Sequence, residues 1–251
     1  MDTLFTGKIV RRFDETTSTN ELAAEALKNA KVIEGTAFVA KYQTQGKGQR
    51  GNVWLSRPNQ NILASYVYYP SFLKTDQQFY LIKAVSLAIK DLLDKYLIDK
   101  ARIKWPNDIY INDLKITGIL IESSTKGDYM GSSIIGIGIN VNQNQFAEDV
   151  NATSIVLETG IGCNLEMLFS ELSYHLEQRY LMLKRSPKGL DSEYQNALYR
   201  LNEKTNFTLN GKQTELTVLG VDELGQLKVR NHLGEIAHYG MHQIKMEVPK
   251  Y

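Results

Sequence analysis

Residues 41–54 place basic side chains among glycines, a combination that suits an anionic ligand. The three glycines of interest are Gly46, Gly48 and Gly51. Because glycine has no Cβ, the backbone there can take positive φ and approach a ligand closely, while Lys47 and Arg50 supply positive charge. The segment does not match the pattern G-x-x-x-x-G-K-[ST], and the acidic ribose partner of a dinucleotide site, about 20 residues on, is not evident. Taken alone, the segment is better explained as a flexible loop between two strands.

Asp108 and Lys115 form a second candidate pair. Pro106 removes a backbone donor and favours an extended residue before it, so Asn107 and Asp108 are presented from a defined bend. Residues 112–113 (Asn-Asp) predict a hairpin turn, which would let Asp108 and Lys115 converge across two strands. A turn aspartate and a solvated lysine at a strand end explain the same residues equally well.

Residues 132–142 alternate strictly between two kinds of side chain. One face is branched and apolar, and the other carries Gly136, Gly138, Asn140 and Asn142. Glycine weakens a strand, so two glycines on one face indicate close approach by a ligand or by another backbone. Unpartnered buried amides are costly, which favours the ligand.

A polar run at residues 14–20 precedes apolar residues at helical spacing. Ser18 or Thr19 is the expected N-cap, and Glu21 suits the first turn. The run carries more donors and acceptors than a cap needs, and the surplus could hold a polar ligand at the helix N-terminus. For any one of these residues, capping is the simpler explanation.

The remaining pattern predicts the elements that position these residues. Strands are expected at residues 8–13, 35–42, 61–69, 109–111 and 116–121, and helices at 82–96, 165–184 and 191–201. From about residue 206, short β-like runs are divided by turns at residues 210–211, 224–225 and 233–234. They predict a small β-barrel-like domain of about 45 to 50 residues, which should dock on the rest because it is small.

Composition excludes several classes of protein. The chain has 251 residues, 43% of them hydrophobic and 23% charged, which is typical of a globular protein. A net charge of +1 gives no general field for nucleic acid, and the single Cys163 cannot form an intramolecular disulfide. No apolar run approaches the roughly 18 residues of a membrane span, and no signal peptide is evident. We expect a cytoplasmic protein without nucleic-acid or membrane partners, and the histidines show no metal-ligand spacing.

Taken together, five segments resemble the biotin–protein ligases in order and in spacing. They are residues 18–20, 42–54, 104–108, 115–122 and 136–141, and residues 220–227 are similar to the family's small C-terminal SH3-like domain. The resemblance implies an α/β (α+β) fold, with a mixed-sheet catalytic domain of the biotin/lipoate ligase type over residues 1–203 and an SH3-like β-barrel over residues 204–251. With no helix-turn-helix segment before the catalytic domain, the monofunctional form without a DNA-binding domain is expected.

The resemblance also implies a reaction. ATP and Mg²⁺ would convert biotin to biotinyl-5′-AMP, and biotin would pass to a lysine of the biotin carboxyl carrier domain of a biotin-dependent carboxylase. The implied catalytic residues are Lys115, Asp108 and Arg50. The implied biotin site comprises Ser18, Thr19, Asn20, Gln43, Gly46, Lys47, Gly48, Gln49, Lys115, Gly118, Gly136 and Gly138. The implied adenylate site comprises Lys47, Arg50, Trp54, Asn107 and Asn140, with Asp108 as a magnesium ligand or as the base for the carrier lysine.

Two departures from the family's pattern concern phosphate and adenine. Lys47 and Gln49 stand where the family often has arginine, so a bidentate grip on phosphate is lost at both positions. Retention of the activated intermediate would then rest more on Arg50 and Lys115. Residues 151–155 offer no aromatic ring for adenine. A lipoate–protein ligase and a non-catalytic biotin or nucleotide sensor stay open as alternatives, and a homodimer is left open.

Overall fold

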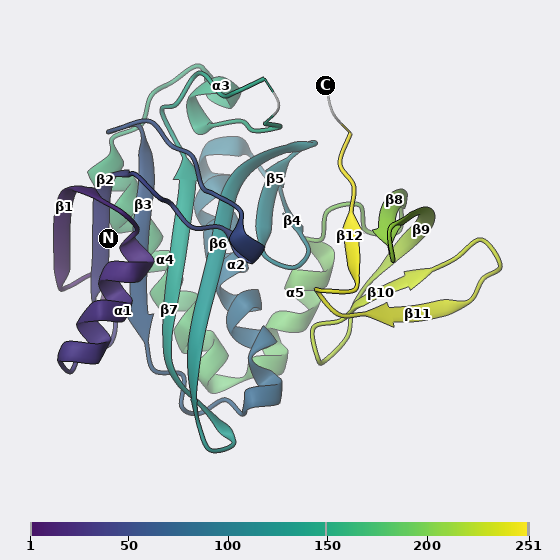
Figure 1. Cartoon of the computed structure of the whole chain (residues 1–251), viewed down its shortest axis with the longest axis horizontal. Coiled ribbons are helices and arrows are strands. Elements are labelled where there is room, and N and C mark those ends of the chain that lie inside the picture. The colour runs from purple at the N-terminus through teal and green to yellow at the C-terminus, as the bar shows by residue number, and fades with distance from the viewer. Residues whose placement is uncertain (1, 149, 250–251) are drawn as a thin grey trace.

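The computed structural model describes residues 2–148 and 150–249, apart from the side chain of Arg50. Its largest element is a seven-stranded sheet in the order β1-β2-β3-β7-β6-β5-β4 (Figure 1). The strands are β1 (Val10–Thr16), β2 (Ala37–Gln43), β3 (Asn61–Tyr68), β4 (Ala101–Lys104), β5 (Asp108–Ile111), β6 (Leu114–Lys126) and β7 (Tyr129–Asn140). β1 and β2 are parallel and the other neighbours antiparallel, which confirms the predicted mixed sheet.

Helices lie on both faces of this sheet (Figure 1). α1 (Thr19–Asn29) shares a face with the loop that follows β2, whereas α2 (Phe79–Leu97) and α4 (Leu165–Arg185) lie on the opposite face. The shorter helices are α3 (Ile155–Thr159), α5 (Asp191–Asn196), η1 (Gln49–Gly51), η2 (Thr75–Gln77) and η3 (Pro187–Leu190). Within the described residues, none of the helices has the length and apolarity that a membrane crossing requires.

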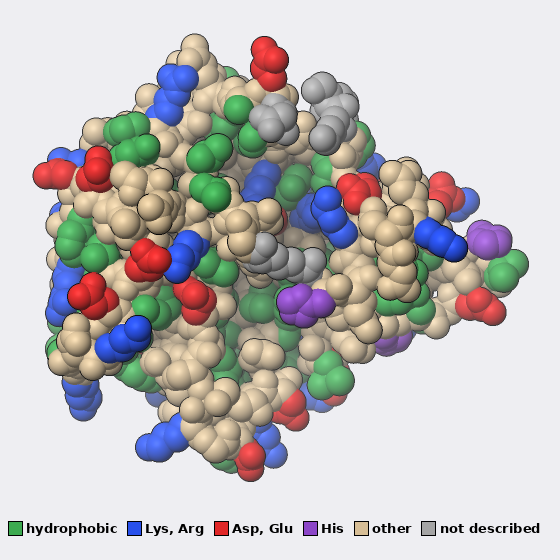
Figure 2. All heavy atoms as spheres, viewed as in Figure 1, with side chains coloured by type: hydrophobic (Ala, Val, Ile, Leu, Met, Phe, Trp, Pro, Cys, Tyr) green, Lys and Arg blue, Asp and Glu red, His purple; other side chains and the backbone are tan. Residues whose placement is uncertain are grey.

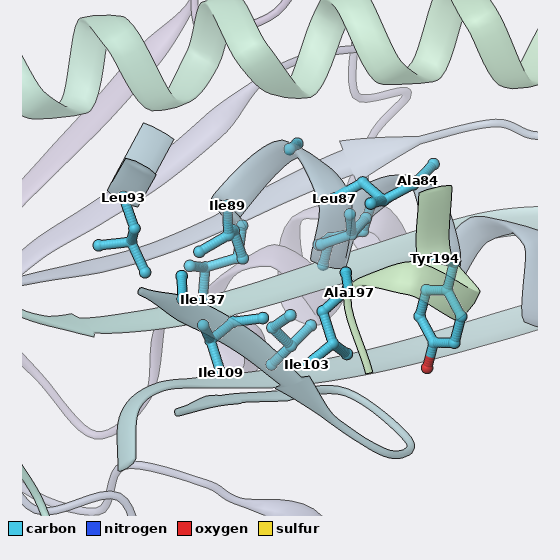
Figure 3. Packing of buried hydrophobic residues seen from close by; sticks show 14 of the residues in the cluster. Ala84, Leu87, Ile89, Leu93, Ile103, Ile109, Ile137, Tyr194 and Ala197 are labelled. Carbon is cyan, nitrogen blue, oxygen red and sulfur yellow. The ribbon is translucent and has the colours of Figure 1, made fainter. Parts of the chain in front are cut away.

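The hydrophobic core lies between the sheet and α2. In Figure 3, Ile89 and Leu93 of α2 point toward Ile137 of β7 and Ile109 of β5. Each of these four side chains is at most 3% exposed, and burying one contributes roughly 1.5–3 kcal/mol. The apolar spacing over residues 82–96 correctly predicted this helix. Ile137 belongs to the apolar face that the alternation in β7 predicted, so the glycine face of β7 is turned away from α2.

The C-terminal residues form a second, antiparallel sheet in the order β11-β10-β9-β8-β12. Its strands are β8 (Lys204–Leu209), β9 (Lys212–Val221), β10 (Leu227–Arg230), β11 (Ile236–Tyr239) and β12 (Ile244–Met246). Asn210 and Gly211 turn between β8 and β9 with φ of 49° and 76°, as the Asn-Gly pair predicted. β12 was not predicted, because three residues are too few for a periodic signal.

The second sheet docks at the bend between β4 and β5. The Trp105 indole N–H donates to the carbonyl oxygen of Gly225 at 2.9 Å, and a Cβ at Gly225 would collide with Phe79. Gln195 exchanges hydrogen bonds with the backbone of Val221. The expected docking is therefore confirmed. It requires glycine at position 225, where φ is 82° and no space is left for a side chain.

One predicted helix is shorter than expected. Helix was predicted over residues 191–201, but α5 ends at Asn196. Leu198 forms a parallel bridge with Ile103 of β4, and Arg200 has a φ of 60°. Leu198 is buried, at 3% exposed. Pairing with the edge of the large sheet therefore replaces the last helical turn.

Candidate active site

A cavity of about 510 Å³ lies on the glycine face of the large sheet, beside α1, the loop after β2 and the C-terminal segment around β12. Figure 2 shows the molecule hollowed between its larger and smaller parts. The expected site residues that line the cavity are Ser18, Thr19, Asn20, Gln43, Lys47, Gly48, Gln49, Trp54, Asn107, Asp108, Lys115, Gly118, Gly136 and Gly138. Gly46 and Asn140 do not line it, and the side chain of Arg50 lies outside the described residues.

Asp108 and Lys115 form an ion pair, with 2.8 Å between Oδ2 and Nζ. The hairpin between β5 and β6 brings them together, as predicted. The backbone of Lys115 is fixed on its other side, because its N–H donates to Asn151 and its carbonyl oxygen accepts from Thr153, each at 3.0 Å. The side chain of Lys115 is 30% exposed and that of Asp108 is 27% exposed. A ligand in the cavity can therefore reach a lysine whose position is set by two strands.

A hydrogen-bonded network lies at the N-terminus of α1. Thr19 donates through its backbone N–H and its hydroxyl to Gln43 Oε1, at 2.7 and 3.0 Å. Ser65 Oγ lies 2.7 Å from Thr19 Oγ1 and 2.6 Å from Asn20 Oδ1. Asn20 Nδ2 donates to Glu122 at 2.6 Å, which fixes the amide with its oxygen toward Ser65. The polar run and the loop thus meet in one network.

This network has fewer hydroxyl protons than oxygen–oxygen contacts. The hydroxyls of Thr19 and Ser65 supply two protons for three such contacts, because each hydroxyl donates once. One acceptor position is therefore left without a proton. The side-chain nitrogen of Gln43 donates to no described residue. The network can accept a hydrogen bond from a ligand N–H and donate one to a ligand oxygen.

The helix begins where the polar run predicted, but no side chain of the run caps it with a hydrogen bond. Ser18 occupies the N-cap position with extended φ and ψ, but its side chain makes no capping hydrogen bond. Thr19 already belongs to the helix and bonds to Gln43 instead. Ser65 was missed by sequence reasoning, because every residue of β3 is buried and the strand shows no alternation.

The glycines of the cavity face make room for two side chains of the protein itself. A Cβ at Gly136 would collide with Asn20, and a Cβ at Gly118 would lie 2.7 Å from the Trp54 ring. A Cβ at Gly138 would also overlap that ring, lying 2.7 Å from its Nε1. A ligand was expected to make this close approach, so the expectation is corrected here. The indole N–H of Trp54 is buried without an acceptor among the described residues.

The loop after β2 folds back on itself. The Gly48 N–H donates to Asn52 at 2.7 Å, and the Trp54 N–H donates to Gly46 at 2.8 Å. Of its three glycines only Gly51 has a positive φ, 78°, and Gly46 and Gly48 do not use this conformational freedom. Gly46 packs against the backbone of Trp54, which explains why it does not line the cavity.

Lys47 ties this loop to α1. Its Nζ lies 2.8 Å from Glu21 Oε1. The hydrogen bond raises the pKa of Lys47 and lowers that of Glu21. Glu21, expected only as a favourable first-turn residue, is therefore also the anchor of the loop.

The three candidate asparagines differ in the hydrogen bonds that their side-chain amides make. Asn107 Nδ2 donates to the carbonyl oxygen of Ile119, which ties the bend before β5 to β6. Asn140 Nδ2 donates to Thr153 at 3.0 Å, but its buried Oδ1 has no partner among the described residues. Asn142 exchanges two hydrogen bonds with the backbone of Cys163, at 2.9 and 2.8 Å. The expectation of unpartnered amides was therefore wrong for Asn142.

Sequence reasoning missed part of the cavity lining. The additional lining residues include Lys104, Trp105, Tyr110, Met241, Ile244, Lys245 and Met246. Lys104 and Trp105 belong to a segment that was singled out, but only its last two residues were given roles. No signal in the sequence indicated that residues 241–246 return to the cavity.

A magnesium ion fits the chemistry of this site. In the part of the chain that the structure describes, no three His, Cys, Asp or Glu side chains are grouped as metal ligands. Mg²⁺, however, is often held by one or two carboxylates together with substrate phosphates. Asp108 is the acidic residue that lines the cavity and fits this role. His238 pairs with Asp222 at 2.7 Å on the C-terminal sheet, away from the cavity lining.

Gly138→Ala is expected to displace Trp54 and weaken ligand binding. The added Cβ would overlap the indole, and such overpacking costs about 1–3 kcal/mol. The tryptophan emission should shift to longer wavelength as the ring becomes exposed. Gly189→Ala is the matched control, because its Cβ would meet its nearest neighbour at 3.6 Å. An unshifted spectrum with unchanged ligand affinity would show that Trp54 does not depend on Gly138.

Known proteins resemble this chain in sequence and in fold. The model of the biotin/lipoate A/B protein ligase family matches residues 12–140, just over half of the chain. The chain is 35% identical over 161 residues to the bifunctional ligase/repressor BirA of Salmonella typhimurium, covering 63% of this chain and 49% of that protein. It is 26% identical over 219 residues to the biotin–[acetyl-CoA-carboxylase] ligase of Mycobacterium tuberculosis, covering 85% of this chain and 80% of that protein. The chain thus spans about half the length of the bifunctional relatives it matches.

A solved structure extends the likeness to the whole described fold. The biotin protein ligase from Aquifex aeolicus in complex with biotin and ATP aligns with a TM-score of 0.81 and 25% identity, over 96% of this chain and 100% of that chain. The family match begins in β1 and ends with the last residue of β7, so it contains α1, the loop, Asp108, Lys115 and the cavity glycines. This chain therefore belongs to the biotin/lipoate A/B protein ligase family.

Proposed function

We propose that this chain is a biotin–protein ligase. It activates biotin with ATP as biotinyl-5′-AMP and transfers the biotinyl group to a lysine of a biotin carboxyl carrier domain. The observation that carries the proposal is the Lys115–Asp108 pair, which lies in the same cavity as the polar network of α1. The names of the relatives support the same chemistry, since the first relative is a ligase/repressor and the second a biotin–[acetyl-CoA-carboxylase] ligase.

The polar network favours biotin over lipoate. Biotin ends in a cyclic urea with a carbonyl oxygen and two N–H groups, whereas lipoate ends in a dithiolane ring that has neither. Thr19 and Ser65 leave an acceptor without a proton, and the Gln43 amide nitrogen is an available donor within the described residues. A site built to hydrogen-bond its ligand rejects an analogue that leaves its buried polar atoms unpaired.

The first step brings two anions together. A biotin carboxylate oxygen attacks the α-phosphorus of ATP, a mixed anhydride forms, and pyrophosphate leaves. Two unit charges about 4 Å apart interact by roughly 4 kcal/mol at an effective dielectric of 20, so a cation between them has a large effect on the rate. Lys115 is that cation, with Asp108 holding its ammonium group in place. Positioning and electrostatic stabilisation suffice, and no protein nucleophile is needed.

The loop after β2 covers the reactive intermediate. The mixed anhydride is prone to hydrolysis, so water must be excluded while it waits for the carrier. Trp54 lies against the glycine face, and Lys47 ties the loop to α1. Gly48 and Gln49 also line the cavity. In this proposal Lys47 and Arg50 supply positive charge for the phosphate, and Trp54 forms a wall of the cavity.

The second step requires a neutral amine on the carrier lysine. Asp108 either accepts its proton or holds Mg²⁺, and both roles fit a carboxylate that is 27% exposed in the cavity. When bound, the ion supplies positive charge to the phosphates. Asn107 precedes Asp108 in the chain and also lines the cavity.

We divide the chain into a catalytic domain, residues 1–203, and an SH3-like domain, residues 204–251. The division is supported by β8, which begins at Lys204 and opens the second sheet. The proposed partner is the carrier domain of a biotin-dependent carboxylase. That the protein is cytoplasmic remains a prediction, and whether it forms a homodimer is left open.

ATP–pyrophosphate exchange tests the proposed function. The full chain is incubated with ATP, Mg²⁺ and labelled pyrophosphate, with biotin, with lipoate or with neither acid. We expect label to enter ATP only when biotin is present. Exchange with lipoate alone would identify a lipoate ligase. No exchange with either acid, from a protein that is folded by circular dichroism, would contradict the ligase and favour a sensor.

A further inference from the structure

The cavity lining carries more positive than negative charge. Among the described residues that line it, four are lysines and one is acidic: Lys47, Lys104, Lys115, Lys245 and Asp108. Lys47 is paired with Glu21, and Lys115 with Asp108. Lys104 and Lys245 are therefore the lysines of the lining whose charge is least neutralised by the protein.

Lys104 is a half-buried cation beside other cations. It lies directly opposite Asp108 in the β4–β5 ladder, but that carboxylate bonds to Lys115. Among the described residues, no carboxylate lies within ion-pair distance of Lys104 Nζ. Burial lowers the pKa of Lys104, and the ammonium groups of Lys115 and Lys245 lower it further, against nearby carboxylates that raise it. The Lys104 Nζ lies 5.6 Å from the centroid of the Tyr110 ring, so its charge is partly compensated. A cation without a carboxylate partner in a cleft is typical of a binding site.

Lys245 reaches the cavity from the C-terminal sheet. It is the middle residue of β12, between the buried side chains of Ile244 and Met246, which hold the strand in place. Its own side chain is 71% exposed, and Glu247 lies 3.7 Å away. That carboxylate also accepts a hydrogen bond from Thr208 at 2.8 Å. Lys245 therefore presents a charge that is only weakly compensated.

The order of the strands places the lysines Lys104 and Lys245 at one end of the cavity and the polar network of α1 at the other. α1 packs over β2, β3 and β7, and β6, β5 and β4 follow in that order, carrying Lys115, Asp108 and Lys104. Neighbouring strands lie about 4.8 Å apart, so β6 and β4 are separated by roughly 10 Å. A ligand with its polar end at α1 and its carboxylate at Lys115 leaves the cavity beyond Lys115 open. Figure 2 shows lysine and arginine side chains in and beside the hollow there.

We propose that Lys104 and Lys245 together bind the β- and γ-phosphates of the nucleotide and hold them as pyrophosphate when they leave. This inference rests on the proposed function and gives the leaving group a site. In the first step a carboxylate oxygen bonds to the α-phosphorus while the bond from that phosphorus to the bridging oxygen breaks. The electron pair of the broken bond leaves with pyrophosphate, and the two ammonium groups stabilise the charge that develops. Because Lys245 belongs to β12, the first step then requires the docked C-terminal sheet.

Pyrophosphate binding tests the inference without requiring turnover. Inorganic pyrophosphate is titrated calorimetrically, in Mg²⁺ buffer, into the full unaltered chain and into its Lys104→Met and Lys245→Ala variants. Methionine keeps the apolar stem of Lys104 and removes its charge. We expect about tenfold weaker binding in each variant, because one partly screened charge is lost. Lys212→Ala, which removes another exposed lysine of the same sheet, should bind pyrophosphate as the unaltered chain does.

Two further measurements keep the outcomes distinct. Circular dichroism and biotin titration should be unchanged in both lysine variants, since neither residue belongs to the polar network. Unchanged pyrophosphate affinity in both variants would overturn the inference, as would a lack of pyrophosphate binding by the unaltered chain. Biotin-dependent exchange by the unaltered chain is measured separately. If the unaltered chain shows normal exchange but the two lysine variants bind pyrophosphate as tightly as it does, only this inference is contradicted. If the unaltered chain shows no exchange but the variants bind pyrophosphate more weakly, only the ligase function is contradicted.

Discussion

Lys115→Ala is expected to slow the formation of biotinyl-5′-AMP about a thousandfold. The ammonium of Lys115 is the fixed cation between the biotin carboxylate and the α-phosphate, and a charge pair at about 4 Å contributes roughly 4 kcal/mol, or about three powers of ten in rate. The measurement is biotin-dependent ATP–pyrophosphate exchange at saturating ATP. Biotin should still bind through Thr19 and Gln43, so the loss should appear mainly in the rate of the chemical step.

Lys126→Ala is the matched control for this variant. Lys126 lies on the same strand, β6, but at its exposed far end. We expect normal exchange from it, and a normal circular dichroism spectrum from both variants. Normal exchange from a folded Lys115→Ala protein would show that the carboxylate and phosphate are held by other residues, and the proposed role of Lys115 would be wrong.

Asp108→Asn is expected to lower turnover by about 10² to 10⁴, the range typical of a lost general acid–base group. The substitution keeps the shape of the side chain and removes its charge, both as a partner of Lys115 and as a base or metal ligand. Asp108 is partly exposed, so little stability should be lost. Biotin transfer to a carrier domain, followed over time by mass spectrometry, measures the effect.

The same variant separates the two roles proposed for Asp108. If Asp108 holds Mg²⁺, the Mg²⁺ concentration needed for half-maximal adenylate formation should rise. If it is the base, the Mg²⁺ requirement of adenylate formation should stay unchanged, and transfer to the carrier should slow more than adenylate formation does and change its pH profile. Asp128→Asn, in the exposed turn between β6 and β7, is the control and should have no effect. An unfolded Asp108→Asn protein would instead support a structural role for this residue.

The part of the site that depends on local structure could be predicted from the sequence. Asp108 and Lys115 lie on two strands joined by a two-residue turn, which pairs Tyr110 with Lys115 and so brings Asp108 near Lys115, although the pairing is irregular between Ile109 and Tyr110. The same reasoning identified the glycine face of β7, because alternation in a strand is a local property. Local patterns also located most of the strands and the two long helices.

What fills the glycine face could not be predicted, because it depends on contacts between distant segments. Gly136 makes room for Asn20, and Gly138 for Trp54, yet the pattern of β7 indicates only that something approaches closely. Ser65 was hidden for a related reason, since β3 is buried along its whole length and offers no alternation.

The return of β12 to the cavity was likewise outside local reasoning. β12 has three residues, and its position follows from antiparallel pairing with β8 and from the docking of Gly225 on Trp105. These are tertiary contacts, and the spacing of apolar residues along the sequence does not predict them. The helix predicted over residues 191–201 failed in the same way, because pairing of Leu198 with β4 overrides the helical pattern.

The central claim is that this chain attaches biotin to a carrier lysine through an adenylate. The most direct measurement is the intact mass of a purified biotin carboxyl carrier domain after incubation with the chain, ATP and Mg²⁺, together with either biotin or lipoate. We expect the mass to rise by one biotinyl group with biotin, to stay unchanged with lipoate or without ATP, and to stay unchanged when the acceptor lysine of the carrier is replaced. No mass gain with either acid, from a protein shown to be folded, would contradict the claim.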